Sequence, residues 1–112
     1  MLSTIMPKLS VIIPIYNEEG NINKLFERLE QVVRQLNVEA EYIFVNDGSR
    51  DNTLSKLKQA CYNQPKLHFI SFSRNFGHQI AITAGMDYAS GDAIVTIDGD
   101  LQDPPELIKE MY

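Results

Sequence analysis

Four short apolar runs, separated by stretches long enough to form a helix, constrain the fold of this chain more than any other feature. The runs are rich in β-branched and aromatic residues, which favours strands. They are Leu9–Ile15, Tyr42–Val45, Leu67–Phe72 and Ala93–Ile97. The first, second and fourth are nearly continuous in hydrophobicity, as expected for strands that are covered on both faces. The pattern therefore predicts a sheet buried between layers of helices.

The intervals between these runs carry helical patterns. From Asn21 to Leu36, apolar residues recur at steps of three and four, which is typical of an amphipathic helix. A shorter helix is expected from Asn52 to Cys61, and a less periodic one from Gln79 to Ala89. Strands joined by helices of this length favour parallel pairing with right-handed crossovers. The predicted fold class is α/β, a Rossmann-like parallel sheet with flanking helices.

Size and charge limit the class of protein. The chain has 112 residues and a formal net charge of −5, and its basic residues are scattered, so a nucleic-acid partner is not expected. The single cysteine, Cys61, cannot form an internal disulfide. No apolar run approaches the roughly 18 to 20 residues that a membrane span requires, so this chain is expected to be soluble.

The domain organisation follows from the last residues. Asp103-Pro104-Pro105-Glu106 has the pattern of a helix start, with Asp103 as N-cap and Pro104 in the first helical position. The chain stops at Tyr112, before such a helix could lead to another strand. Residues 1–112 are therefore expected to be the front part of a larger domain.

Polar residues follow each predicted strand. Parallel strands bring their carboxyl ends to one edge of the sheet, where open α/β folds bind ligands. The clusters are Tyr16–Glu19, Asn46–Ser49, Ser73–Asn75 and Asp98–Asp100. Each cluster alone can also be read as a helix-capping turn, because Asp, Asn and Ser favour such positions. Together they predict a ligand site at this edge.

Asp98-Gly99-Asp100 is the sharpest of these clusters. Two carboxylates separated by one glycine repel each other unless a cation lies between them. Oxygen ligands suit Mg²⁺ or Mn²⁺, and the amide oxygen of Gln102 can add a ligand. The alternative is a tight turn in which an Asp side chain caps the backbone.

The second and third clusters contain further candidates. Asp47 can accept a hydrogen bond from a nucleobase N–H, and Gly48 permits a close approach. Asp51 is interpreted as the cap of the helix that starts at Asn52. The guanidinium of Arg74 suits a diphosphate, with a solvated surface arginine as the alternative.

The remaining candidates for site residues are the two histidines and the segment Tyr16–Glu18. His78 is interpreted as a loop or helix-cap residue and His68 as a packing or edge residue within a strand, so neither is expected to be catalytic. Tyr16, with the neighbouring Asn17 and Glu18, can frame a base or a ribose, although the last two also suit a helix start.

Four ordered segments resemble the N-terminal region of family 2 glycosyltransferases of the GT-A type: Ser10–Glu18, Val45–Asp51, Ser73–Gly77 and Ile97–Glu106. The stretch from Ser73 to Glu106 is similar to polyprenyl-phosphate glycosyltransferases, including dolichol-phosphate mannose synthases and bacterial undecaprenyl-phosphate glucosyl- or aminoarabinose transferases. Two positions differ from the usual pattern, since Asn46 stands where many relatives have Asp and Gly99 where this subgroup often has Ala.

The resemblance implies a GT-A nucleotide-diphospho-sugar transferase fold and a UDP- or GDP-linked donor. It places the nucleotide against Pro14, Tyr16, Glu18, Asp47, Arg74, Asp98 and Gly99. It makes Asp98 and Asp100 the catalytic residues and, with Gln102, the ligands of Mg²⁺ or Mn²⁺. The implied acceptor is a polyprenyl phosphate, which attacks with inversion and needs no general base because it is already anionic.

Two other functions remain as alternatives, a phosphotransferase and a binding fragment without turnover. A haloacid-dehalogenase-type phosphotransferase also uses Asp-x-Asp after a strand. A nucleotide-sugar-binding fragment without turnover is the second alternative, because the acceptor half would lie beyond Tyr112. No G-x-G-x-x-G or G-x-x-x-x-G-K-[ST] pattern is present, which disfavours dinucleotide-binding and P-loop proteins. The parent protein is expected at the cytoplasmic side of a membrane, with membrane contact through parts outside this chain.

Overall fold

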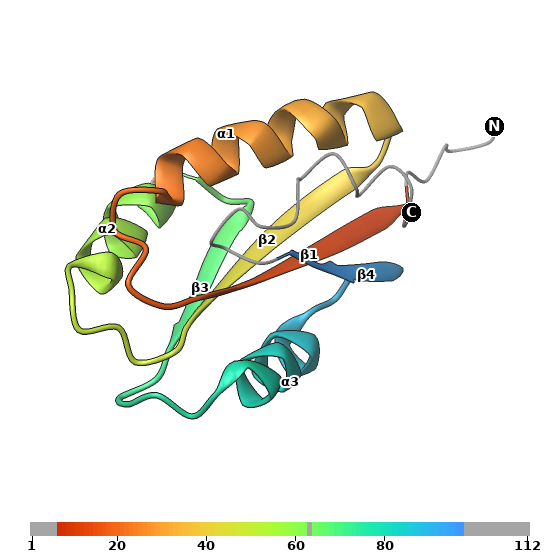
Figure 1. The fold of residues 1–112 in the computed structure, drawn as a ribbon. Helices are drawn as coiled ribbons and strands as arrows, with labels where there is room; N and C mark the ends of the chain where they lie inside the picture. Colours follow the sequence, from red (N-terminus) through yellow and green to blue (C-terminus); the bar gives the residue numbers. More distant parts are fainter. Residues whose placement is uncertain (1–6, 63, 98–112) are drawn as a thin grey trace, which may run out of the picture.

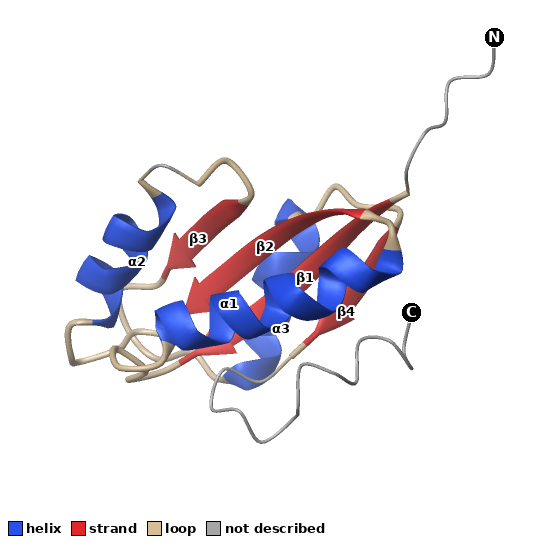
Figure 2. Cartoon of the chain, turned by 90° about the horizontal axis from the view of Figure 1, so that it is seen from above, coloured by secondary structure: helices blue, strands red, loops and turns tan. Residues whose placement is uncertain are grey.

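The computed structural model describes residues 7–62 and 64–97. They form one sheet of four parallel strands in the order β3-β2-β1-β4 (Figure 2). The strands are β1 (Lys8–Ile15), β2 (Glu39–Asn46), β3 (Leu67–Ser71) and β4 (Ala93–Thr96). The predicted parallel sheet and the alternation of strands and helices are confirmed.

The helices form a layer on each face of this sheet. They are α1 (Ile22–Val33), continued by a 3-10 turn (Arg34–Leu36), α2 (Thr53–Cys61) and α3 (His78–Tyr88). Helices α1 and α2 lie on one face and α3 on the other (Figure 1). Along β1, Val11 and Ile13 belong to the core on the α1 and α2 side, while Ile12 packs in the smaller core beneath α3. This alternation explains why the first apolar run is continuous.

Strand β2 begins at Glu39, three residues before its predicted start at Tyr42. The difference arises because Glu41 is charged yet buried. Its carboxylate accepts hydrogen bonds from the Ser10 hydroxyl at 2.6 Å and the Ser90 amide at 2.8 Å, and Lys8 Nζ lies 3.4 Å away. Partners distant in the sequence therefore compensate the desolvation of this carboxylate, which a local pattern does not show.

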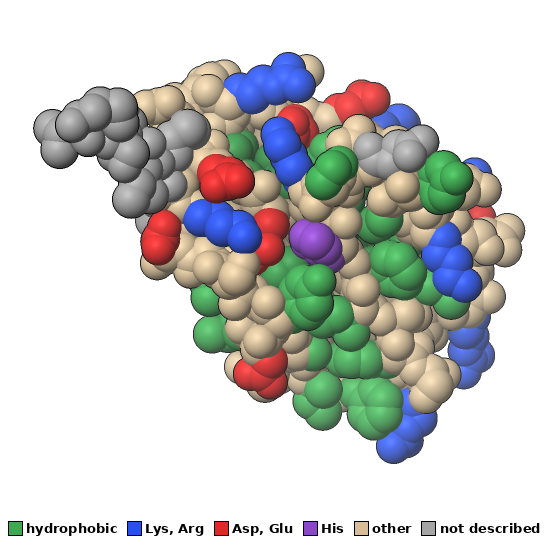
Figure 3. Space-filling model, turned by 180° about the vertical axis from the view of Figure 1, so that it is seen from behind, with side chains coloured by type: hydrophobic (Ala, Val, Ile, Leu, Met, Phe, Trp, Pro, Cys, Tyr) green, Lys and Arg blue, Asp and Glu red, His purple; other side chains and the backbone are tan. Residues whose placement is uncertain are grey.

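Helix α3 packs unusually close to the sheet. A Cβ built on Gly85 would lie 2.5 Å from Cγ2 of Ile12, so only glycine fits this contact without a shift. Its outward side keeps apolar residues, since Ile80, Met86 and Tyr88 are each about half exposed. Figure 3 shows hydrophobic side chains gathered over the lower part of the molecule, where Figure 1 places α3. This distribution explains why the helix was only weakly periodic in the sequence.

Among the residues that the structure describes, no helix combines the length and the apolar character needed to cross a membrane.

Candidate active site

The chain proceeds from β1 to β2 and β3 on one side, and then returns to place β4 on the other side of β1. Such a reversal opens a crevice beyond the carboxyl ends of the strands that flank it, here β1 and β4. The described loops that follow β1, β2 and β3 lie along this edge of the sheet. Their geometry decides which predicted side chains can act together.

The loop after β1 and the loop after β2 bind each other through Asn17. Its backbone N–H donates to the Ser49 hydroxyl at 2.9 Å, and its side-chain Oδ1 accepts from the Arg50 N–H at 2.8 Å. Asn17 has a positive φ of 53°, a conformation that asparagine tolerates better than most residues. A strained backbone turn and two reciprocal hydrogen bonds thus fix the relative position of these loops.

A second pair of contacts joins the same loops nearer to α2. The Glu18 N–H donates to Thr53 Oγ1 at 3.0 Å, and the Glu19 N–H donates to Asp51 Oδ2 at 3.4 Å. Asp51 also accepts from the Thr53 N–H at 3.0 Å and from the Thr53 hydroxyl. Burial raises the pKa of the Asp51 carboxyl, but these hydrogen bonds outweigh it and leave the pKa below its ordinary value. Helix α2 begins at Thr53 with Asn52 at the N-cap position, one residue later than predicted, and Asp51 instead accepts from the N–H of the first helical residue.

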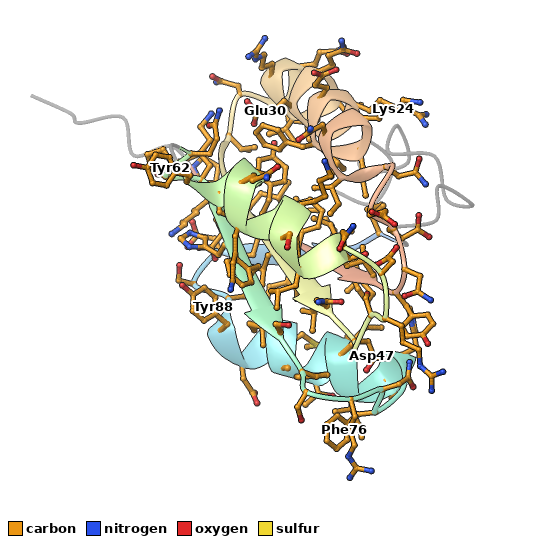
Figure 4. The ribbon with its side chains drawn as sticks, turned by 90° about the vertical axis from the view of Figure 1, so that its left-hand side faces the viewer. Lys24, Glu30, Asp47, Tyr62, Phe76 and Tyr88 are labelled. Carbon is orange, nitrogen blue, oxygen red and sulfur yellow. The ribbon has the colours of Figure 1, made fainter. Side chains whose placement is uncertain are left out.

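Asp47 connects the loop after β2 to the loop after β3. Its side chain is only 6% exposed, and its two carboxylate oxygens accept from the backbone N–H groups of Phe76 at 2.7 Å and Gly77 at 3.1 Å. The Asn75 side-chain amide donates to the Asp47 backbone carbonyl at 3.2 Å. Figure 4 shows Asp47 above the loop that carries Phe76. The carboxylate therefore anchors this loop.

Gly48 shows why these two loops can come so close. Its φ is +70°, and a Cβ at this position would lie 2.2 Å from the Arg74 carbonyl carbon and 2.4 Å from the Asn75 nitrogen. No side chain fits against that backbone. The close approach expected at Gly48 is made by the loop after β3.

Arg74 is exposed, and its guanidinium carbon lies 4.4 Å from the ring centroid of Phe76. The Phe76 ring in turn packs edge-on against Phe72, with 5.5 Å between the centroids. Stacking on an aromatic face restricts the guanidinium while its N–H donors remain available. This is a suitable arrangement for holding an anionic group.

Pro14 ends the pairing between β1 and β4. The carbonyl of Ile12 points to β4, where it accepts from the Ile97 N–H at 2.9 Å. The backbone nitrogen of Pro14 also faces β4, because Pro14 lies two residues further along the strand. The next bond of a parallel ladder would run from residue 14 to the Ile97 carbonyl, but proline has no N–H. The ladder accordingly ends with the pair Ile12 and Thr96. Among the described residues, the hydrogen bond from Ile97 to Ile12 is therefore the last one between these two strands.

The other predicted site residues are placed as follows. Pro14 is buried, Tyr16 is 41% exposed, and the Glu18 carboxylate accepts from the Asn21 side chain at 2.7 Å. Asp98, Gly99, Asp100 and Gln102 lie outside the described residues. Within residues 7–62 and 64–97, no three His, Cys, Asp or Glu side chains gather in a way that could hold a metal ion.

Several residues of this network were not singled out from the sequence. Asn46 accepts hydrogen bonds from the Ser49 amide and hydroxyl and donates to Ser71 at 3.2 Å. Thr53 and Phe76 likewise join loops that are far apart in the sequence. Asn46 directly follows a predicted strand and was noted only as a departure from the family pattern, while Thr53 and Phe76 lie further along the segments that follow predicted strands. His68 lies on β3 and contacts Tyr88, with 3.3 Å between Nδ1 and the phenol oxygen, in agreement with a packing role.

The comparisons with known proteins agree with this arrangement. The family model described as "Glycosyl transferase family 2" matches residues 10–112. The chain belongs to glycosyl transferase family 2. The match includes all three described loops and the Asp98-Gly99-Asp100 segment.

Similar members of glycosyl transferase family 2 include enzymes named for lipid carriers. The chain is 40% identical over 104 residues to a prophage bactoprenol glucosyl transferase homolog of Escherichia coli, covering 93% of this chain and 34% of that protein. It is 46% identical over 106 residues to an undecaprenyl-phosphate 4-deoxy-4-formamido-L-arabinose transferase of Photorhabdus laumondii, covering 93% and 32%. An uncharacterized Bacillus subtilis glycosyltransferase, YkcC, is 56% identical over 102 residues, covering 91% and 32%. The chain thus spans about a third of the length of the relatives it matches.

Solved structures of glycosyltransferases support the GT-A fold. The mannosyltransferase PcManGT from Pyrobaculum calidifontis, in complex with GDP-Man and Mn²⁺, superposes with a TM-score of 0.70 at 25% identity, covering 90% of this chain and 34% of that one. S. aureus TarS 1-349 in complex with UDP-GlcNAc gives 0.69 at 27% identity, covering 92% and 31%. The predicted fold and the resemblance to polyprenyl-phosphate glycosyltransferases are therefore confirmed.

Proposed function

We propose that the complete protein transfers a sugar from a nucleoside-diphosphate sugar to a polyprenyl phosphate. The observation that carries this proposal is that the loop after β2 bonds both the loop after β1 and the loop after β3, at the edge of the sheet to which the carboxyl ends of all four strands point. The names of the bactoprenol and undecaprenyl-phosphate relatives support the choice of acceptor. The nucleotide sugars in the two solved complexes support the choice of donor.

In this proposal the loops divide the donor between them. Pro14, Tyr16, Glu18 and Asp47 line the nucleoside pocket, while Arg74, Asp98 and Gly99 approach the diphosphate. Tyr16 offers an exposed ring on which a base can stack, and Arg74 offers a guanidinium already oriented by Phe76. The hydrogen bonds among the loops fix their relative positions, and such preorganisation reduces the cost of ordering a site on binding.

The residues after Ile97 fit a divalent cation by their chemistry. Asp98, Asp100 and Gln102 present only oxygen donors, the set that Mg²⁺ and Mn²⁺ prefer. A cation held there would stabilise the negative charge on the departing diphosphate. The Mn²⁺ in the PcManGT complex supports this assignment.

The proposed reaction is a single displacement. An oxygen of the lipid phosphate attacks the anomeric carbon, the bond from that carbon to the diphosphate oxygen breaks, and the nucleoside diphosphate leaves with the electron pair. Attack from the opposite side inverts the anomeric centre. No proton has to be removed from a phosphate that is already ionised, so no general base is required. The donor diphosphate is instead held by Arg74, and Asp98, Asp100 and Gln102 would hold the cation that offsets its charge.

The parts of the protein beyond this chain complete the proposal. We place the acceptor site and the membrane contact there, at the cytoplasmic side of the membrane, and we expect residues 1–112 alone to bind the donor without turnover. The haloacid-dehalogenase alternative does not fit membership in glycosyl transferase family 2.

Titration of the complete protein with UDP and GDP tests the donor site. Binding of one of them should require Mg²⁺ or Mn²⁺ and weaken at least tenfold in Asp98→Asn and in Asp100→Asn, because each substitution removes a charged ligand. Metal-independent binding that neither substitution affects would contradict the metal assignment.

A transfer assay tests the acceptor. Radiolabelled sugar from a panel of UDP- and GDP-sugars is offered to undecaprenyl phosphate, and the lipid product is recovered by organic extraction. Transfer to water alone, with no lipid product, would contradict it.

A further inference from the structure

We infer that Asp47 is a positioning residue for Arg74, acting through the backbone of the loop after β3; this inference rests on the proposed function. Asp47 was expected to accept a hydrogen bond from a nucleobase. In the structure, both oxygens of its carboxylate accept from backbone amides, those of Phe76 and Gly77. A residue that is 6% exposed and engaged at both oxygens is suited to fixing a loop.

The anchored loop carries the diphosphate-binding side chain. Phe76, whose amide is held at 2.7 Å, is the residue on whose ring the Arg74 guanidinium stacks at 4.4 Å. The position of the carboxylate thus sets the position of the ring, and the ring restricts the guanidinium. A Cβ on Gly48 would lie only 2.2 Å from the Arg74 carbonyl carbon, so the backbones of the two loops are packed directly against each other.

Further contacts stabilise the same junction. The Asn75 side chain donates to the Asp47 carbonyl at 3.2 Å, and the Phe72 N–H donates to the Asn46 carbonyl at 2.9 Å. Helix α3 begins directly after the second anchored amide, that of Gly77, whose φ is +104°. Loss of the carboxylate would therefore release the segment between β3 and α3, while those contacts keep both elements attached.

The two roles of Asp47 predict different binding patterns. If Asp47 positions Arg74, Asp47→Asn weakens binding of the preferred nucleoside diphosphate about tenfold and leaves the ratio of UDP to GDP affinities unchanged. Asp47→Asn and Arg74→Ala are then non-additive, because both remove the same interaction. If Asp47 instead binds the base, its loss changes the UDP to GDP ratio and adds to the effect of Arg74→Ala.

Isothermal titration of the complete protein with UDP and GDP in the presence of Mg²⁺ measures these quantities. Asp87→Asn is the matched control, because it removes one exposed carboxylate from α3, the helix that the loop enters, and it should bind like the wild type. A changed base preference, additivity with Arg74→Ala, or wild-type affinity in Asp47→Asn would overturn the inference. A wild-type protein that binds neither UDP nor GDP would contradict the proposed donor site itself.

A milder variant keeps the test decisive if Asp47→Asn does not fold. Asn75→Ala removes one contact between the loops and leaves the carboxylate in place. It should lower the affinity for the preferred nucleoside diphosphate by about threefold, without changing the ratio between UDP and GDP. Wild-type affinity in this variant would equally overturn the inference.

Discussion

A Cβ on Gly48 would lie 2.2 Å from the carbonyl carbon of Arg74, so these two residues meet at a distance that only a glycine allows. Gly48→Ala should lower the free energy of unfolding by roughly 2–4 kcal/mol, because the side chain must adopt a positive φ and push the facing backbone away. Urea denaturation measures this loss. Gly20→Ala is the control, since no atom lies within 4 Å of its Cβ position, and it should leave stability nearly unchanged. Equal stability of both variants would contradict the close approach.

Asn17 combines a strained backbone with a hydrogen bond between loops, and Asn37 has the same φ of 53° without a side-chain hydrogen bond in the part of the chain that the structure describes. Asn37→Gly should be neutral or slightly stabilising, because glycine adopts this φ readily. Asn17→Gly gains the same relief but loses the bond to the Arg50 N–H, and should be less stable than Asn37→Gly by about 1 kcal/mol. Thermal unfolding of the two variants measures the difference. Indistinguishable stabilities would show that the bond contributes nothing.

Pro14 should end the ladder between β1 and β4 because it has no backbone N–H to donate. In Pro14→Val the new N–H can donate to the Ile97 carbonyl, and the ladder between β1 and β4 can lengthen by one bond. Hydrogen exchange followed by NMR should then find a slowly exchanging amide at position 14. Ile13→Val serves as the control, because it leaves position 14 without a donor. Rapid exchange at position 14 would argue that proline does not end this ladder.

The buried carboxylate of Glu41 should make stability depend on pH. Burial raises its pKa, but the hydrogen bonds from Ser10 and Ser90 and the charge of Lys8 outweigh this and hold the pKa below the ordinary value of 4.5. A carboxyl whose folded pKa is lowered stabilises the protein above its unfolded pKa, and the contribution is lost as pH falls through the folded pKa. Stability should therefore fall with pH below about 4.5.

Glu41→Gln isolates this contribution. At pH 7 the variant should be less stable by roughly 2 kcal/mol, because a charged acceptor becomes neutral within the same hydrogen bonds. As the pH is lowered, the difference between wild type and variant should shrink. Asp51 titrates in the same direction in both proteins, so it cancels in this difference. A difference that stays constant from pH 7 to the acid limit would contradict the assignment to Glu41.

The sequence predicted the elements of this fold well because their signals are local. Periodicity gave the order of strands and helices, and the apolar continuity of β1 and β2 predicted cover on both faces. It did not predict that Glu41 lies inside β2, because the residues that compensate its charge are Ser10 and Ser90, far away in the chain. A local pattern contains no information on such partners.

In the candidate site, too, contacts between residues close in sequence could be predicted and contacts between distant residues could not. A role for Asp51 at the start of α2 was predictable because its partner, Thr53, is two residues away. The anchoring of Phe76 by Asp47 spans 29 residues, and although Asp47 was a candidate site residue, nothing in the local sequence pointed to Phe76 as its partner. Three sets of residues stay predictions: the nucleotide contacts, the catalytic carboxylates and the metal ligands. The nucleotide contacts are Pro14, Tyr16, Glu18, Asp47, Arg74, Asp98 and Gly99; the catalytic carboxylates are Asp98 and Asp100; the metal ligands are these two and Gln102.

The hydrogen bonds that join the three loops also limit how such a site can diverge in evolution. Asn17, Asp47 and Asp51 each take their partners from a loop other than their own or from the helix that follows it. Exchange of one loop for that of a relative would leave donors and acceptors in the other loops without these partners. We therefore expect donor preference to be inherited by the three loops as a set, so that chimeras keep their activity only when all three are exchanged together.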